Sequence, residues 1–180
     1  MTLVVNMFGG PGSGKSTTAA GLFSELKERG YNCEMVREYA KDIVWAETTK
    51  TLQDQIYIFA KQLHKMRVLV GKVDLIITDS PILLSLIYGK DKEPASFFDL
   101  VTDIHDTFNN MNIYVKRTKE FNPAGRLQNE DQARALDDQI KDMIFHIGES
   151  ITQFTVGGYA SVPSLADIVE QKLKSSPRDG

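Results

Sequence analysis

The residues whose types and spacing most clearly suggest chemistry lie near the start of the chain, where Gly-x-x-x-x-Gly-Lys-Ser runs from Gly9 to Ser16. An apolar run of strand length, Leu3–Phe8, precedes this pattern, and apolar residues recur at helical spacing after it. Glycines allow several backbone N–H groups to point at one phosphate, and the following helix adds the positive end of its dipole. This stretch therefore predicts a site for nucleotide phosphates.

Residues inside the glycine turn and at the start of the helix are the expected ATP ligands: Gly10, Gly12, Ser13, Gly14, Lys15, Ser16 and Thr17. The Lys15 ammonium can bridge the β- and γ-phosphates, so we also expect it to be catalytic. The Ser16 hydroxyl is suited to complete the ligand shell of Mg²⁺.

A second metal ligand is expected at Asp79, because the apolar segment 73–79 has the pattern of a buried strand that ends in an acid. Such an acid binds Mg²⁺ through water or orients the substrate in a Walker B segment. The alternative is a helix N-cap, since Asp79 and Ser80 come directly before Pro81.

Glu38 is the candidate for the acceptor side of the site. It follows a short predicted strand, Cys33–Val36, and ligands of parallel α/β sheets gather at the carboxyl ends of strands. A carboxylate there can accept a proton from an attacking hydroxyl or hold that hydroxyl in position. The alternative is a solvated Glu at the start of the next helix.

A basic segment after the fourth predicted strand, 111–115, is expected to close over a bound nucleotide as a lid over about residues 117–130. We rank Arg126 first and Arg117 second as groups that neutralise charge on the transferring phosphate, with Arg134 third. Asn129 is expected to cap the helix that follows the lid. Its buried face would hold Ala133, Leu136, Ile140, Met143 and Ile147.

The remaining elements must place these residues. Helices are predicted over 15–29, 81–88, 97–108 and 165–173, and a fifth strand over 151–156, followed by a turn at 157–160. A further helix is predicted from one apolar stripe: Leu52, Ile56, Phe59, Leu63, Met66 and Val70. Trp45 lies ahead of that helix, near Tyr39 and Tyr57, and such aromatic residues either stack on an acceptor base or pack.

Bulk properties are those of an ordinary globular protein. With 180 residues, 42% hydrophobic and 25% charged, we expect one domain over 1–180. The net charge of −3 gives no reason to expect a broad nucleic-acid surface. The single cysteine, Cys33, suits a reducing compartment. Without a leader or membrane-length stretch, the expected location is the cytoplasm, or the host cytoplasm if the protein is phage-encoded.

Four segments together carry a family resemblance: the glycine loop, Arg37-Glu38-Tyr39-Ala40, Asp79-Ser80-Pro81, and Ala124-Gly125-Arg126-x-Gln128. The chain resembles small P-loop kinase-like domains grouped with the nicotinamide riboside kinase domain of the bacterial NAD regulator, many of them phage-encoded. It is also similar to thymidylate and deoxynucleoside kinases, although Ser80 stands where those kinases have arginine. The resemblance implies a three-layer α/β fold with a five-stranded parallel sheet, order 2-3-1-4-5, helices on both faces and a lid.

Three functions remain open at this point. The first is an ATP- and Mg²⁺-dependent kinase that transfers the γ-phosphate to a nucleoside or nucleoside monophosphate, with a homodimer possible. The second is a kinase acting on a hydroxyl of DNA, at a modified base such as hydroxymethyluracil or at a 5′ end. The third is a P-loop NTPase switch without a small-molecule acceptor.

Overall fold

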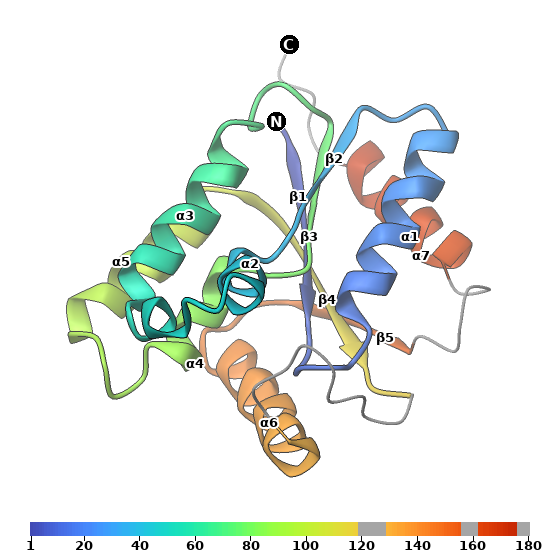
Figure 1. Ribbon diagram of the computed structural model, residues 1–180. Helices are drawn as coiled ribbons and strands as arrows, with labels where there is room; N and C mark the ends of the chain where they lie inside the picture. Colours follow the sequence, from blue (N-terminus) through green and yellow to red (C-terminus); the bar gives the residue numbers. More distant parts are fainter. Residues whose placement is uncertain (119–128, 156–161, 176–180) are drawn as a thin grey trace.

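A computed structural model of the chain describes residues 1–118, 129–155 and 162–175 (Figure 1). Its centre is a sheet built from β1 (Leu3–Phe8), β2 (Cys33–Val36), β3 (Leu75–Thr78), β4 (Asn109–Lys116) and β5 (Ile151–Thr155). Every neighbouring pair is parallel, and the strand order is β2-β3-β1-β4-β5. This is the order expected from the resemblance. The predicted turn at 157–160 and residues 119–128 of the predicted lid lie outside the described residues.

Helices cover both faces of the sheet, as expected. On one face lie α1 (Lys15–Glu28) and α7 (Val162–Ser175), and on the other lie α3 (Gln55–Arg67), α4 (Ser85–Tyr88), α5 (Ala95–Asp106) and α6 (Glu130–His146) (Figure 1). Alternation along β1 explains the two cores, because successive side chains of a strand point to opposite faces. Leu3, Val5 and Met7 pack toward α1 and α7, whereas Val4 and Phe8 pack toward the other helices.

Several predicted boundaries were wrong in detail. The helix expected over 81–88 is a 3-10 helix, Ile82–Leu84, that continues into the short α4. The link before α3 contains α2 (Tyr39–Trp45) and a second 3-10 helix, Thr49–Gln53. Strand β3 occupies Leu75–Thr78 rather than 73–79, and β4 is longer than 111–115.

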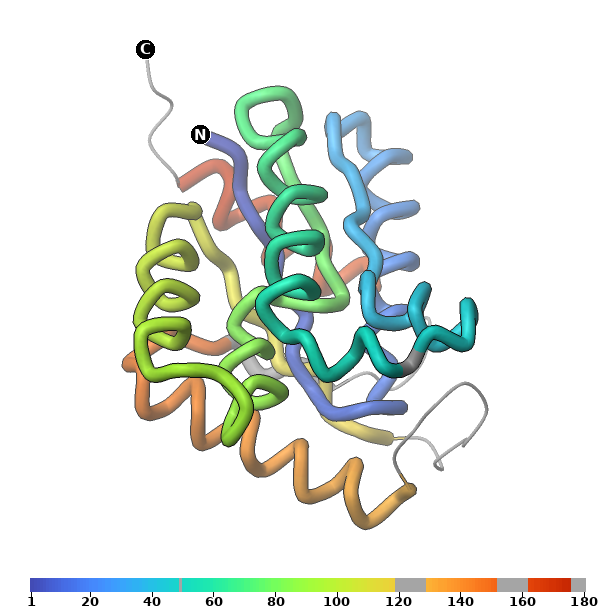
Figure 2. The backbone as a smooth tube through the Cα atoms, turned by 60° about the vertical axis from the view of Figure 1, so that its left-hand side comes forward, coloured from blue at the N-terminus to red at the C-terminus, as the bar shows by residue number. Residues whose placement is uncertain are grey.

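The apolar stripe predicted for α3 is only partly correct. Phe59, Leu63 and Met66 are buried, but Ile56 and Val70 are 48% and 42% exposed. The helix begins at Gln55, and its buried face also includes three residues outside the stripe: Gln55, Ile58 and Gln62. The α3 and α5 helices lie side by side (Figure 2), where Phe59 and Phe97 meet edge to face at 5.6 Å between ring centroids.

Helix α6 begins where the sequence places it. The Asn129 side chain accepts a hydrogen bond from the Gln132 N–H at 2.9 Å, and the Gln132 side chain accepts one from the Asn129 N–H at 3.0 Å. This reciprocal capping box satisfies two N–H groups at the helix start. In Figure 1, α6 runs beside the end of the sheet at which β1 leads into the glycine turn.

In the part of the chain that the structure describes, no helix combines the length and apolar character needed to cross a membrane.

Candidate nucleotide and acceptor site

The glycine turn joins β1 to α1 as predicted, and its backbone depends on glycine. Gly14, directly before α1, has φ +102, a conformation that side-chain-bearing residues rarely adopt. The Lys15 Nζ donates hydrogen bonds to the Gly9 and Gly10 carbonyl oxygens at 2.6 and 3.0 Å. The lysine therefore folds back over the turn, where a bound phosphate would compete for its three donors.

Helix α6 contacts the turn at Gly10. The Gly10 N–H donates to Asp137 Oδ1, and a Cβ at Gly10 would lie 2.6 Å from the Ala133 carbonyl oxygen. Glycine is required here by this close approach of helix backbone. Asp137 is buried, and sequence reasoning did not identify it. The available signal was an acid at position 137 in the apolar face formed by Ala133, Ile140 and Ile144.

Glu38 and Asp79 follow neighbouring strands and lie together at the carboxyl end of the sheet. The Glu38 N–H donates to Asp79 Oδ1 at 2.9 Å, and Asp79 is only 3% exposed. Asp79 therefore anchors the turn after β2. The 3-10 helix that follows it has no side-chain cap, so the N-cap alternative for Asp79 and Ser80 was wrong.

Burial shifts the titration of the groups that face the turn. It raises the pKa of Glu38, although the nearby Lys15 opposes this shift. Burial lowers the pKa of the Lys15 ammonium, while the charges of Glu38, Asp79 and Asp137 act in the other direction. The pKa of Tyr88 is raised as well, chiefly by burial and then by Glu38. Shifted pKa values in one cavity are typical of functional sites.

A cavity of about 410 Å³ connects these groups. Most of the predicted site residues line it: Gly12, Gly14, Lys15, Ser16, Thr17, Glu38 and Asp79. Gly10 and Ser13 are not among its lining residues; Gly10 contacts α6 and Ser13 is buried. The cavity extends from the glycine turn between α2, α3 and α4. Its wall there combines apolar and aromatic side chains with polar ones: Val44, Ile58, Phe59, Ile82, Leu84 and Tyr88, and Gln55, Gln62 and Ser85.

Gln62 also lines the cavity, and its side chain connects three elements around it. Its Oε1 accepts a hydrogen bond from the Tyr39 N–H at 3.1 Å, and its Nε2 donates to Thr78 Oγ1 at 3.3 Å. These bonds tie α3 to the start of α2 and to the end of β3. Sequence reasoning missed Gln62 because a polar residue on the helix did not fit the apolar stripe.

Among the described residues, the arginines predicted to neutralise charge on the transferring phosphate are not found together at the cavity. The Arg117 guanidinium donates from Nε and Nη2 to Asp137 Oδ2 at 3.2 and 2.9 Å, and both side chains are largely buried. Arg117 is not among the cavity-lining residues. Arg134 is exposed and pairs with Glu130 one turn earlier on α6. Arg126 lies outside the described residues.

The aromatic residues singled out from the sequence lie on α2 and α3 but outside the cavity wall. Tyr39 and Tyr57 meet at 5.9 Å between ring centroids, and Trp45 is 67% exposed. The aromatic side chains that line the cavity are Phe59 and Tyr88.

The donor set at the turn fits a Mg²⁺ ion. The Ser16 and Asp79 side chains line the same cavity, and among the described residues no hydrogen bond engages the second carboxylate oxygen of Asp79. Mg²⁺ characteristically takes one or two protein oxygens and completes its shell with water and substrate phosphates. These two side chains are therefore suited to hold it.

Together, the sheet order, the glycine turn between β1 and α1 and the buried acid after β3 define a P-loop α/β domain. A family model described as "AAA domain" matches residues 4–160. The chain therefore belongs to that AAA domain family. No curated protein matches it.

Solved structures with a similar fold include deoxyadenosine kinase from M. mycoides. The structure with bound dATP has a TM-score of 0.58 at 20% sequence identity. The match covers 96% of this chain and 100% of the kinase chain. With the products dCMP and a flexible dCDP, the TM-score is 0.53 at the same identity and coverage. At this identity, the likeness supports the fold.

Proposed function

We propose that the protein is a kinase that transfers the γ-phosphate of ATP to a nucleoside or nucleoside monophosphate. The observation that carries this proposal is the shared cavity, in which Lys15 and Ser16 of the glycine turn face Glu38. A phosphate donor and an acceptor hydroxyl can therefore meet in one cavity. Phosphoryl transfer needs mainly positioning and charge stabilisation from the protein, and this arrangement supplies both.

Each residue has a defined task in this proposal. The backbone N–H groups of the glycine turn and the Lys15 ammonium bind the donor phosphates, releasing the Gly9 and Gly10 carbonyls from Lys15. Ser16 and Asp79 would hold Mg²⁺, which neutralises charge on the β- and γ-phosphates. Glu38 accepts the hydrogen bond, and then the proton, of the attacking hydroxyl. Arg117 and Arg126 remain proposed sources of positive charge for the transferred group.

The acceptor class follows from the wall of the cavity. Phe59, Ile58 and Tyr88 offer apolar and aromatic surface to a flat base, and Lys41 and Lys92 add positive charge at the same cavity. The fold likeness to deoxyadenosine kinase is compatible with a nucleoside-type acceptor. Nicotinamide riboside belongs to the same chemical class and stays among the acceptors to be tested.

A DNA acceptor is the second candidate, and one surface feature favours it. Tyr39 and Tyr57 lie on the helices that line the cavity, with the Lys65 and Lys61 ammonium groups 5.2 and 5.4 Å from their ring centroids. Aromatic rings combined with lysines are suited to bases and phosphates of a single strand. A strand bound there would extend from the cavity mouth.

The test is transfer of label from γ-labelled ATP in the presence of Mg²⁺. The panel contains nucleosides, nucleoside monophosphates, nicotinamide riboside, and single- and double-stranded DNA with ordinary or hydroxymethylated bases. Label on a small acceptor is expected. Label on DNA alone would favour the second candidate, and free phosphate alone would contradict both kinase proposals.

Two variants connect the outcome to the site. Lys15→Ala is expected to abolish transfer, because Lys15 is the only cationic residue of the glycine turn, Gly9–Ser16. The second variant is Glu38→Gln, which removes the proposed base. Glu34→Gln is its matched control, since Glu34 lies in β2 and its side chain is 47% exposed. Full activity in Lys15→Ala would overturn the assignment of the phosphate site.

A further inference from the structure

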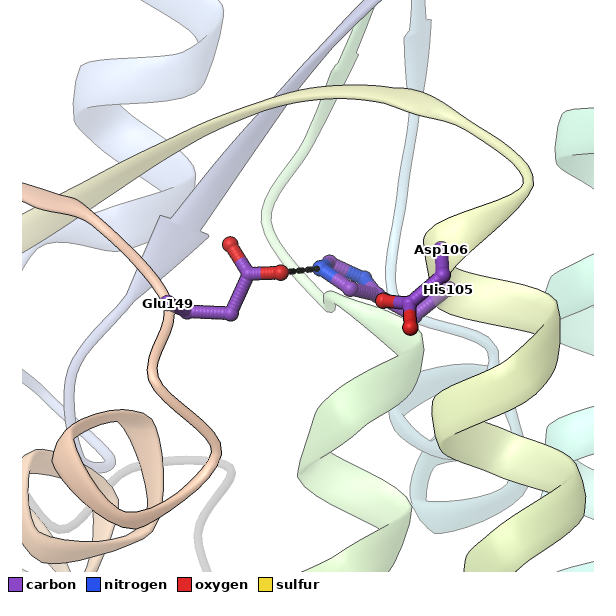
Figure 3. A group of neighbouring side chains, drawn as sticks. All are labelled: His105, Asp106 and Glu149. Carbon is purple, nitrogen blue, oxygen red and sulfur yellow. Dashed lines mark ion pairs between the residues drawn. The ribbon is translucent and has the colours of Figure 1, made fainter.

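A second cluster of chemically active side chains lies away from the nucleotide cavity. His105 and Asp106 end α5, three residues before β4, and Glu149 comes two residues before β5 (Figure 3). The cluster is thus near the amino-terminal ends of two strands, whereas the glycine turn follows the carboxyl end of β1. Nothing in the proposed phosphoryl transfer uses these residues.

The three side chains converge. His105 is 1% exposed, and its Nε2 lies 3.2 Å from Glu149 Oε1. That contact does not meet hydrogen-bond geometry, and within the described residues Nε2 has no other partner. One ligand atom from each of His105, Asp106 and Glu149 lies within 4.8 Å of the other two. Figure 3 shows the Glu149 carboxylate directed at the imidazole.

We propose that His105, Asp106 and Glu149 form a binding site for a first-row transition-metal ion of the Zn²⁺ type. One imidazole nitrogen and two carboxylate oxygens are ligands that Zn²⁺ uses, and a three-ligand set leaves a position for water. In the tetrahedral geometry of zinc sites, ligand atoms about 2.1 Å from the ion lie about 3.4 Å apart. Binding therefore requires side-chain rotations that bring the three ligand atoms closer together than the 4.8 Å within which they now lie.

The chemistry of the cluster favours a transition metal over Mg²⁺, which selects oxygen ligands. The buried His105 Nε2 has no hydrogen-bond partner among the described residues, so in the tautomer that carries its proton on Nδ1 this nitrogen has a lone pair for an ion. Asp106 is exposed and Glu149 is half-buried, so an ion can enter from solvent.

Surrounding hydrogen bonds already orient the ligands. The Asn112 Nδ2 donates to Glu149 Oε2 at 2.6 Å, and the Asn110 Nδ2 donates to the His105 carbonyl oxygen at 2.7 Å. The Asn6 Nδ2 in β1 donates to both of these asparagines, at 2.9 and 3.0 Å. Such outer contacts fix ligand position in metal sites. A bound ion would connect the end of α5 to the segment between α6 and β5.

The experiment is calorimetric titration of Zn²⁺ into full-length protein freed of metal with a chelator. Glu149→Gln and Asp106→Asn are expected to weaken zinc binding at least tenfold, because each removes a charged ligand. Asp103→Asn is the matched control, since Asp103 is exposed on α5 one turn before Asp106. It is expected to change the affinity less than twofold.

A parallel titration of Asp79→Asn separates this site from the phosphate site, because zinc binding at the cluster is expected to persist there. Zinc is also expected to raise the melting temperature of wild type but not of Glu149→Gln. Equal zinc affinities of wild type, Glu149→Gln and Asp106→Asn would overturn the proposal. So would loss of binding in Asp79→Asn alone.

Discussion

Arg117 and Asp137 form a buried ion pair in which the same carboxylate also accepts the N–H of Gly10 in the glycine turn. Arg117 comes directly after β4, and Asp137 lies in α6, so the pair joins the entry of the predicted lid to the glycine turn. The Tyr114 hydroxyl adds a further hydrogen bond to this carboxylate at 3.2 Å.

Removing the charge of Asp137 is expected to destabilise the fold strongly. Asp137→Asn keeps the shape but leaves the Arg117 guanidinium buried without a counter-charge, which costs about 3 kcal/mol or more. Urea denaturation measures this free energy. Glu130→Gln removes the partner of exposed Arg134 on the same helix and is expected to cost less than about 1 kcal/mol. Similar costs for the two variants would contradict the structural role of the buried pair.

A methyl group at Gly10 is expected to separate the turn from α6. The new Cβ would lie 2.6 Å from the Ala133 carbonyl oxygen, and relief requires movement of the helix backbone, at about 1–3 kcal/mol. Gly10→Ala should therefore lower both stability and ATP affinity, measured by denaturation and calorimetry. Gly10→Ala should cost as much stability in an Asp137→Ala background as it does in wild type, because the Ala133 carbonyl oxygen remains. A smaller cost in that background would place the conflict at the Asp137 side chain.

Glu38→Gln is expected to lower turnover by about 100-fold or more, the usual contribution of a general base, with little change in ATP affinity. In wild type, kcat/KM should rise with pH through a pKa above the ordinary 4.5 of a glutamate, because burial disfavours the carboxylate. The acidic limb should be absent in Glu38→Gln. An equal loss of turnover and ATP affinity would indicate a structural role instead.

The same burial makes the ionised form of Glu38 unfavourable in the folded protein. Because the pKa of Glu38 is higher in the folded than in the unfolded state, its contribution to the free energy of unfolding is greatest at a pH below the unfolded pKa. That contribution is lost as the pH rises through the folded pKa. Glu38→Gln should therefore melt higher than wild type at pH 7, with the difference shrinking toward pH 4. A difference independent of pH would exclude ionisation of Glu38 as its cause.

Lys41 and Lys92 are expected to select acceptors that carry a phosphate. Both line the cavity from segments other than the glycine turn, and each charge-assisted contact contributes about 1.5 kcal/mol, or roughly tenfold in affinity. Lys41→Ala and Lys92→Ala should raise KM for a nucleoside monophosphate about tenfold and leave KM for the nucleoside unchanged. Lys90→Ala, at an exposed position outside the cavity lining, is the control. Equal effects on both acceptors would show that these lysines do not bind an acceptor phosphate.

The sequence by itself determined the glycine turn, the order of the elements and the acids at the strand ends. These are local properties: glycine spacing fixes the turn, apolar alternation fixes β1, and a capping residue fixes the start of α6. Glu38 and Asp79 could be predicted because the carboxyl ends of parallel strands necessarily meet at one edge of the sheet.

Tertiary structure alone decided how distant segments complete the site. Asp137 is 127 positions from Gly10, and Gln62 contacts Tyr39 and Thr78 only because α3 packs against both strand ends. The exposed Ile56 and the buried Gln55 show that the buried face of α3 is decided by how the helix packs, and not by apolar spacing alone. Local propensity does not encode such contacts, because they arise from the packing of helices against one particular sheet.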